Sequence, residues 1–407
     1  MTVLALCGFT LAPAAAEGTG ERCRAMQARL VRGGGQASGL FMLDAGSGAV
    51  LCRRAASRRL PLASNMKLFT TGAALRRLGP RTRIPTRVLA TGSLDRRGVL
   101  NGSLYLVGGG DPALGTPAFY RRFLGGLGTN LFALRRQIRA AGVRAVRGRL
   151  YADDSIFDRL RGVADSGYAT SPYIGPLSGL AFNSGYSSSS GRGFASDPAK
   201  LAARKLARAL RRAGVAVRPR VAVGTAPGEA EPIAVVRSPT IARLAAATNV
   251  PSNNYYAEML LKLLGARFGG AGTTAAGAKV VERFARAHGS RVHAVDGSGL
   301  TRTNRASPAE VARFLRSMRG EEAGEEFIDS LAVAGRDGTV DDRMLGTAAE
   351  GRCRAKTGTL TGVSALSGYC VTRSGRTLIF SILMASVRDL GRAHLAQDRI
   401  AAAVAGY

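Results

Sequence analysis

The sequence predicts a mixed α/β protein with more than one domain. Its 407 residues exceed a typical single domain, and 46% hydrophobic against 21% charged side chains are enough to form a large buried core. Strand-like runs at 39–44, 103–107 and 378–384 alternate with amphipathic helical patterns at 132–141 and 201–213. We therefore expect helices and strands to be mixed along the whole chain.

The N-terminus, residues 1–16, has the pattern of a signal peptide. It is apolar and ends in three alanines at 14–16, as in a small-residue cleavage site. No basic residue precedes the apolar stretch, so a buried N-terminal helix is the alternative, and Leu6 before Cys7 disfavours lipid attachment. The stretch is shorter than the roughly 18 apolar residues of a membrane-spanning helix. We expect an exported protein that is not integral to a membrane.

The charge is strongly positive, with 58 basic against 27 acidic residues and a formal net charge of +31. Such a balance suggests a polyanionic partner or an anionic cell surface. Only six of the basic residues are lysines, and 52 arginines are scattered among alanine and glycine, which favours a codon bias over a dedicated site for a polyanion. The chain has no tryptophan and no aromatic residues interleaved with basic clusters, so we expect no nucleic-acid partner.

Four cysteines follow the expected cleavage site, an even number that suits an oxidising compartment. Proximity favours pairing Cys23 with Cys52 and Cys353 with Cys370, the latter across a hairpin that turns at 361–362. Buried free thiols are the alternative. The three histidines and the cysteines show no metal-ligand spacing, so we expect no metal site.

A serine and a lysine three residues apart, Ser64 and Lys67, stand at the head of a helical pattern that ends before Gly79. This spacing places both side chains on one helix face, so the amine can reach the hydroxyl. A lysine acts as a base only when burial or a nearby cation lowers its pKa. The pair by itself is common and proves little.

Two further motifs support a catalytic role for this pair. Ser252 and Asn254 supply a hydroxyl and an amide two residues apart before a helical run, and Lys356, Thr357 and Gly358 open the first strand of the expected hairpin. A Lys-Thr-Gly triplet is rare in a chain with six lysines. Together with Ser-x-x-Lys, this order of motifs is that of penicillin-binding proteins and class A β-lactamases.

The sequence resembles the low-molecular-mass class C penicillin-binding proteins, the D-alanyl-D-alanine carboxypeptidase/endopeptidase family. The middle motif departs from Ser-Asp-Asn because Asn253 takes the central place, while its two flanking residues are kept. The resemblance covers nearly all of the chain after residue 16 and includes LYLVGGGDP at 104–112, the stretch 148–157, PSNNYYAEML from 251, DGSGLTRTN from 296, AGRDGTVDDRM from 334 and AKTGTLTGVSALSGY from 355.

The resemblance implies a catalytic domain like that of penicillin-binding proteins and serine β-lactamases, an antiparallel sheet flanked by helices. The first and second motifs are 185 residues apart, which matches the family's habit of inserting a domain there. We expect an inserted α/β domain at 86–239 and a discontinuous catalytic domain at 17–85 and 240–407.

The chemistry of the first motif gives Ser64 the role of nucleophile and neutral Lys67 that of the base that takes its proton. Lys356 nearby would lower the pKa of Lys67 by like-charge repulsion. The backbone amides of Ser64 and Thr359 are the expected oxyanion hole.

The resemblance assigns the remaining roles. Ser252 relays a proton to the leaving amine, and Asn254 binds the substrate backbone. Lys356 with Thr357 binds the terminal carboxylate, and Gly358, without a side chain, lets a substrate strand lie close to the sheet edge.

These assignments predict a secreted serine-type D-alanyl-D-alanine carboxypeptidase of the periplasm or cell wall. Its partners are peptidoglycan stem peptides as substrate and β-lactams as covalent inhibitors, with no cofactor; endopeptidase activity on cross-links is a further option. The alternatives are a β-lactamase or esterase on the same scaffold, and a catalytically idle, cationic wall-binding protein. The glycines at 108–110 lack the lysine of a phosphate loop, and for Asp296 and Ser298 a structural turn competes with a place beside the cleft.

Overall fold

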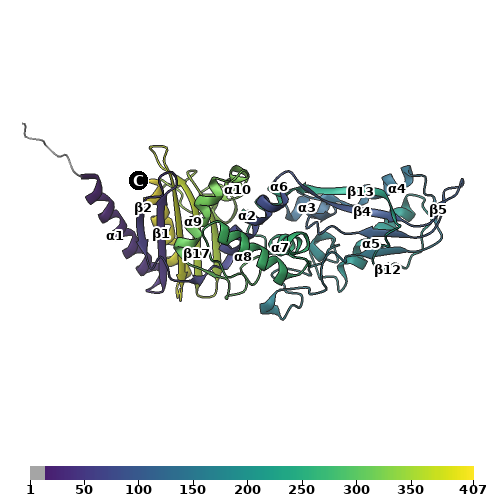
Figure 1. Ribbon diagram of the computed structural model, residues 1–407, viewed down its shortest axis with the longest axis horizontal. Coiled ribbons are helices and arrows are strands. Elements are labelled where there is room, and N and C mark those ends of the chain that lie inside the picture. Colours follow the sequence, from purple (N-terminus) through teal and green to yellow (C-terminus); the bar gives the residue numbers. More distant parts are fainter. Residues whose placement is uncertain (1–13) are drawn as a thin grey trace, which may run out of the picture.

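The computed structural model of the protein describes residues 14–407, so nearly all of the expected signal peptide at 1–16 lies outside the described residues. The two largest β-sheets lie at opposite ends of an elongated molecule, and helices α2, α6 and α7 lie between them (Figure 1). These helices span Met66–Leu78, Ile241–Asn249 and Asn254–Phe268.

The larger sheet has six strands, and every neighbouring pair is antiparallel. Its order is β15-β16-β17-β18-β1-β2, so the N-terminal strands join the far side of a C-terminal meander. The antiparallel sheet flanked by helices is therefore confirmed. In the order of the sheet the strands are Ala332–Val333, Cys353–Leu360, Val363–Val371, Thr377–Ala385, Ser38–Asp44 and Val50–Arg54.

Both faces of this sheet are buried, which explains why β1 reads as a continuous apolar run rather than an alternating one. Leu40 and Met42 belong to the core beneath helices α1 (Ala14–Gly34) and α11 (Leu390–Ala405). Phe41 and Leu43 point to the other face, where the core includes residues of α2, α7, α8 (Thr274–Ala287) and α9 (Pro308–Arg319).

The second sheet is mixed, with the order β12-β11-β7-β4-β13, and has its own apolar core. Its two longest strands, β4 (Arg83–Ala90) and β13 (Glu231–Thr240), pair antiparallel, and Arg83 lies opposite Thr240. The chain thus leaves α2 and returns to α6 through adjacent strands, as an inserted segment would. The shorter strands are β7 (Leu104–Val107), β11 (Leu150–Asp153) and β12 (Ala222–Val223); helices α4 (Leu134–Ala140) and α5 (Pro198–Arg212) pack on this sheet.

Both expected disulfides are present, Cys23–Cys52 and Cys353–Cys370. The second lies directly across the hairpin of β16 and β17, where the two cysteines are register partners. Remaining elements are short: α3 (Pro117–Phe123), α10 (Gly324–Asp329), β3 (Leu60–Pro61), β5 (Ser93–Leu94), β6 (Val99–Asn101), β8 (Leu114–Gly115), β9 (Thr129–Asn130), β10 (Ala145–Val146) and β14 (Arg305–Ala306). Between residues 14 and 407, no helix has both the length and the apolar character needed to cross a membrane.

Candidate active site

Ser64 lies in a single 3-10 turn, η1 (Ala63–Asn65), immediately before α2, rather than within the helix that the sequence predicts. The turn starts with Ala63 in the left-handed region, at φ 45°. Two glycines from distant segments allow it to pack closely: a Cβ on Gly299 would lie 1.8 Å from the carbonyl oxygen of Ala63, and one on Gly358 would lie 3.0 Å from the amide nitrogen of Ser64. The backbone around the nucleophile is therefore fixed by tertiary contacts.

The amine of Lys67 is buried in the first turn of α2 and reaches three oxygens. It donates to Ser64 Oγ at 2.9 Å, to Asn254 Oδ1 at 2.7 Å and to the carbonyl oxygen of Ser298 at 2.7 Å. Burial lowers the pKa of Lys67 to about 7, while the carboxylates of Glu258 and Asp296 partly oppose the shift. A substantial fraction of this amine is therefore neutral near pH 7.

Two buried carboxylic acids organise the loop that faces Lys67. Glu258 stands one turn after Asn254 on α7 and accepts from the amides of Gly297 and Ser298, at 3.1 and 2.7 Å. Burial, with Asp296 nearby, raises the pKa of Glu258 to about 7. Burial likewise raises the pKa of Asp296, which accepts from the amide of Gly299.

These contacts aim the carbonyl of Ser298 at Lys67, so the turn containing Asp296 and Ser298 does reach the site. The sequence analysis missed Glu258 entirely. The available signal was a lone acidic residue in the apolar run YYAEMLL, four residues after Asn254 and thus on the same helix face.

The middle motif occupies the connection between α6 and α7. Asn253 is the N-cap of α7, and its side chain accepts from the amide of Tyr256 at 3.1 Å. Asparagine and aspartate cap equally well, which accounts for the departure from Ser-Asp-Asn. Asn254 bonds to Lys67 through its oxygen and to the carbonyl of Tyr173 through its nitrogen, at 3.1 Å. Ser252, in the left-handed region at φ 60°, makes no side-chain hydrogen bond within the part of the chain that the structure describes.

The third motif lies on β16, whose edge is unpaired beyond Ala355 because β15 ends there. Lys356 is fully buried, and its amine donates to the carbonyl of Thr357 at 3.0 Å. Burial, and then the charge of Lys67, hold the pKa of Lys356 well below its usual range. The Asn65 amide donates to the carbonyl of Lys356 at 2.9 Å and ties this strand to the nucleophile turn.

The cause of the Lys67 shift differs from the sequence argument, which attributed it to repulsion by Lys356. Burial is the largest cause for both amines, and the repulsion acts on Lys356. The physical reason is that the first turn of α2 is covered by packed segments, so Lys67 is completely shielded from solvent.

Two cavities meet at Ser64. One, of about 580 Å³, lies on the side of Asn254 and is closed by a loop that contributes Val163, Asp165, Ser166, Ser171 and Tyr173. The other, of about 320 Å³, lies on the side of β16 and is lined by Thr339, Arg343, Thr357, Gly358 and His394. Ser64, Ser252 and Thr359 border both cavities.

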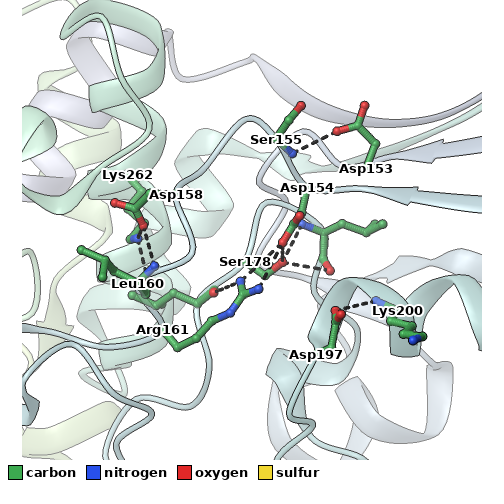
Figure 2. Close-up of polar contacts among 12 residues, drawn as sticks. Asp153, Asp154, Ser155, Asp158, Leu160, Arg161, Ser178, Asp197, Lys200 and Lys262 are labelled. Atoms are coloured by element: carbon green, nitrogen blue, oxygen red, sulfur yellow. Dashed lines mark hydrogen bonds and ion pairs between the residues drawn. The ribbon is translucent and has the colours of Figure 1, made fainter. Parts of the chain in front are cut away.

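The loop that closes the larger cavity is anchored to α7 and to itself (Figure 2). Lys262, buried on α7, donates to Asp158 and to the carbonyl of Leu160. Arg161 pairs with Asp154 and donates to the carbonyl of Leu177 at 2.7 Å. Helix α7 thus positions Asn254 at its start and holds the cavity wall two turns later.

The structure brings all the sequence-predicted site residues together. Ser64, Lys67 and Asn254 share one hydrogen-bond cluster, Ser252, Thr357, Gly358 and Thr359 line the cavities, and Lys356 lies buried behind them. Among residues 14–407, no group of three histidine, cysteine or acidic side chains is arranged to hold a metal ion.

A hydroxyl bonded to a buried amine, at the junction of two open cavities, defines a serine acyl-transfer enzyme with a lysine in place of histidine. The comparisons with known proteins specify which one. The chain belongs to the D-Ala-D-Ala carboxypeptidase 3 (S13) family, whose sequence model matches residues 25–192 and 187–405. The resemblance to class C penicillin-binding proteins is confirmed, and the protein is a serine peptidase.

Individual relatives agree with this assignment. The D-alanyl-D-alanine carboxypeptidase of Actinomadura sp. (strain R39) is 34% identical, over 92% of this chain and 82% of the relative. Carboxypeptidase Rv3627c of Mycobacterium tuberculosis is 30% identical, over 86% of this chain and 76% of its own length. The structure of penicillin binding protein 4 from Haemophilus influenzae shares the fold, with a TM-score of 0.77, 19% identity and coverage of 93% of this chain and 97% of that one.

Proposed function

We propose that this enzyme removes the terminal D-alanine from peptidoglycan stem peptides through an acyl-enzyme on Ser64. The observation that carries the proposal is the position of the Lys67 amine, which bridges Ser64 Oγ and Asn254 Oδ1. When neutral, the amine keeps two N–H groups for Asn254 and the carbonyl of Ser298, and its lone pair faces the serine hydroxyl. It can then accept the serine proton.

The reaction follows from this arrangement. Ser64 Oγ attacks the carbonyl carbon between the two D-alanines while its proton moves to Lys67. The amides of Ser64 and Thr359 bind the developing oxyanion, for which one donor contributes roughly 3 to 4 kcal/mol in comparable enzymes. Ser252, which borders both cavities, relays the proton to the leaving amine. D-alanine departs, and water hydrolyses the ester.

β-Lactams are the expected covalent inhibitors, because they present an acylating carbonyl to the same serine. The Haemophilus influenzae relative has been solved in complex with a β-lactam. A β-lactamase on this scaffold would need a carboxylate free to activate water. Glu258 is engaged by the amides of Gly297 and Ser298, so it is not free for that role, and Asp165, which lines the larger cavity, is the carboxylate that a β-lactamase would have to use. The match to the carboxypeptidase family supports the carboxypeptidase over the β-lactamase.

We also propose export and action outside the cytoplasm, which the two disulfides support. The proposed division into an inserted domain at 86–239 and a catalytic domain at 17–85 and 240–407 is supported by the core of the second sheet, whose residues all lie within 86–239, and by the pairing of β4 with β13.

The test is release of D-alanine from a peptide ending in D-Ala-D-Ala, together with intact-mass analysis after penicillin treatment. We expect wild type to release D-alanine and to carry one penicillin adduct. The control variant Ser57→Ala, at an exposed position, should do the same. Ser64→Ala should do neither. Release by Ser64→Ala at the wild-type rate would refute the mechanism, and rapid turnover of penicillin without an adduct would favour the β-lactamase.

A further inference from the structure

The smaller cavity contains one cationic side chain that the mechanism does not use. Arg343 lines this cavity together with Thr357, Thr359 and Ser64. Lys356, which the resemblance assigns to the terminal carboxylate, is completely buried and does not line either cavity. Burial and the nearby Arg343 lower the pKa of His394, the other titratable side chain of this cavity. A positive charge at the cavity surface near neutral pH therefore comes from the guanidinium.

Arg343 is held rigidly by helix α11. Its Nε and Nη2 donate to Asp398 Oδ1 at 3.0 and 2.7 Å, and Nη2 also donates to Gln397 Oε1 at 3.0 Å. Gln397 in turn donates to Ser364 Oγ at 2.9 Å, and Ser364 is the register partner of Thr359 on β16. One network thus fixes the guanidinium relative to the strand that borders the nucleophile.

The other end of the guanidinium is free. Within residues 14–407, Nη1 of Arg343 makes no hydrogen bond, and it is not among the buried atoms that lack a partner. The side chain keeps 9% of its surface accessible. Both Nη1 hydrogens therefore remain available to a ligand in the cavity.

We propose that Nη1 of Arg343 binds the free carboxylate of the substrate's terminal D-alanine, beside the hydroxyls of Thr357 and Thr359. This assignment rests on the proposed function. Arginine suits the task because it stays charged when largely buried, whereas a buried amine tends to lose its proton. The pair with Asp398 orients the guanidinium and leaves its outward edge for the ligand.

The experiment compares two substrates of the full-length enzyme: an N-acetylated tripeptide ending in D-Ala-D-Ala, and the same peptide with a C-terminal carboxamide. We expect wild type to prefer the acid by at least about tenfold in kcat/KM, the lower range for a charged hydrogen bond. Arg343→Gln should lower kcat/KM for the acid by about 10- to 100-fold and change that for the amide less than about threefold. Arg354→Gln, which removes an exposed ion pair with Asp329, is the matched control and should retain the preference.

If Arg343 only stabilised the fold around the cavity, Arg343→Gln would lower kcat/KM equally for the acid and for the amide. That result would overturn the proposal. Asp398→Asn provides a second variant, because it keeps the guanidinium and removes its fixed counter-charge. We expect it to preserve or increase the preference for the acid, and loss of that preference would also overturn the proposal. A wild type that cleaves acid and amide equally would overturn it without any variant. Failure of wild type to release D-alanine at all would instead refute the proposed function.

Discussion

The rate of acylation of Ser64 should rise with pH through a value near 7, because only the neutral amine of Lys67 can take the serine proton. With a pKa of about 7, about one-tenth of the amine is neutral at pH 6 and about nine-tenths at pH 8. We therefore expect the second-order rate of labelling by a fluorescent penicillin to increase between these pH values by up to about tenfold, the ratio for an amine that titrates alone. The assay is run at constant ionic strength from pH 5.5 to 9. A flat profile, or a rise only near the ordinary lysine value, would refute the reasoning.

The same profile tests the role of the buried Glu258. Its negative charge favours the protonated form of Lys67, so Glu258→Gln should move the rise in labelling rate to lower pH. Glu258 itself has its pKa raised to about 7, so the wild-type rise reflects the titration of both groups together. The variant removes one of them and should sharpen the profile to a single step.

The effect of Glu258→Gln on the stability of the fold can be measured separately, with a control variant at an exposed position. The Glu258 carboxylate accepts hydrogen bonds from the backbone amides of Gly297 and Ser298. In Glu258→Gln, one of its oxygens becomes an NH₂ group, which cannot accept, so we expect a loss of about 1 to 3 kcal/mol in the free energy of unfolding. Urea unfolding measures this loss. Glu322→Gln, at an exposed position, is the control and should leave both profile and stability unchanged. A rise that stays in place or moves to higher pH in Glu258→Gln would contradict the proposed electrostatics.

Substitutions at two further positions test how the motifs are held. Gly358→Ala places a Cβ 2.9 Å from the carbonyl oxygen of Leu62 and 3.0 Å from the amide nitrogen of Ser64, so the nucleophile turn must shift. We expect labelling by penicillin to slow by about tenfold or more and the melting temperature to fall; an unchanged labelling rate would argue against close packing here. Asn253→Ala removes the cap on the amide of Tyr256 and should cost about 1 kcal/mol in urea unfolding, whereas Asn253→Asp should retain both stability and activity. Equal stability of these two variants would remove the capping role.

The motif residues could be predicted from sequence because their chemistry admits few substitutes. Lys67 must lose its proton and Lys356 must act as a compact point charge, which arginine cannot do in either case, so both lysines stand out in a chain with 52 arginines. The hairpin and its disulfide were predictable because both strands and the two-residue turn lie within one short segment. Local information was sufficient in these places.

Other parts of the site depend on contacts between distant segments, which a single sequence does not reveal. The loop that contains Asp165 borders the larger cavity, and the contacts of Lys262 and Arg161 hold it there. The orientation of Arg343 depends on Gln397 and Asp398 of α11, more than fifty residues later in the chain. The sequence alone also suggested the wrong cause for the lowered pKa of Lys67. Burial is the largest cause, and it depends on how completely distant segments cover the first turn of α2.

Three of the six lysines are fully buried, and all three belong to the site or its wall: Lys67, Lys262 and Lys356. Burial lowers the pKa of each. An arginine at such a position would remain charged and would keep its full desolvation cost, whereas a lysine can shed its proton and become neutral. Lysine therefore suits these three enclosed positions better than arginine would, whereas Lys200, Lys205 and Lys279 lie at half-buried or exposed positions. For Lys67, the ability to lose its proton lowers the free-energy cost of burial and also lets the amine act as a base. The stability of the fold and the reactivity of Ser64 therefore have one physical origin.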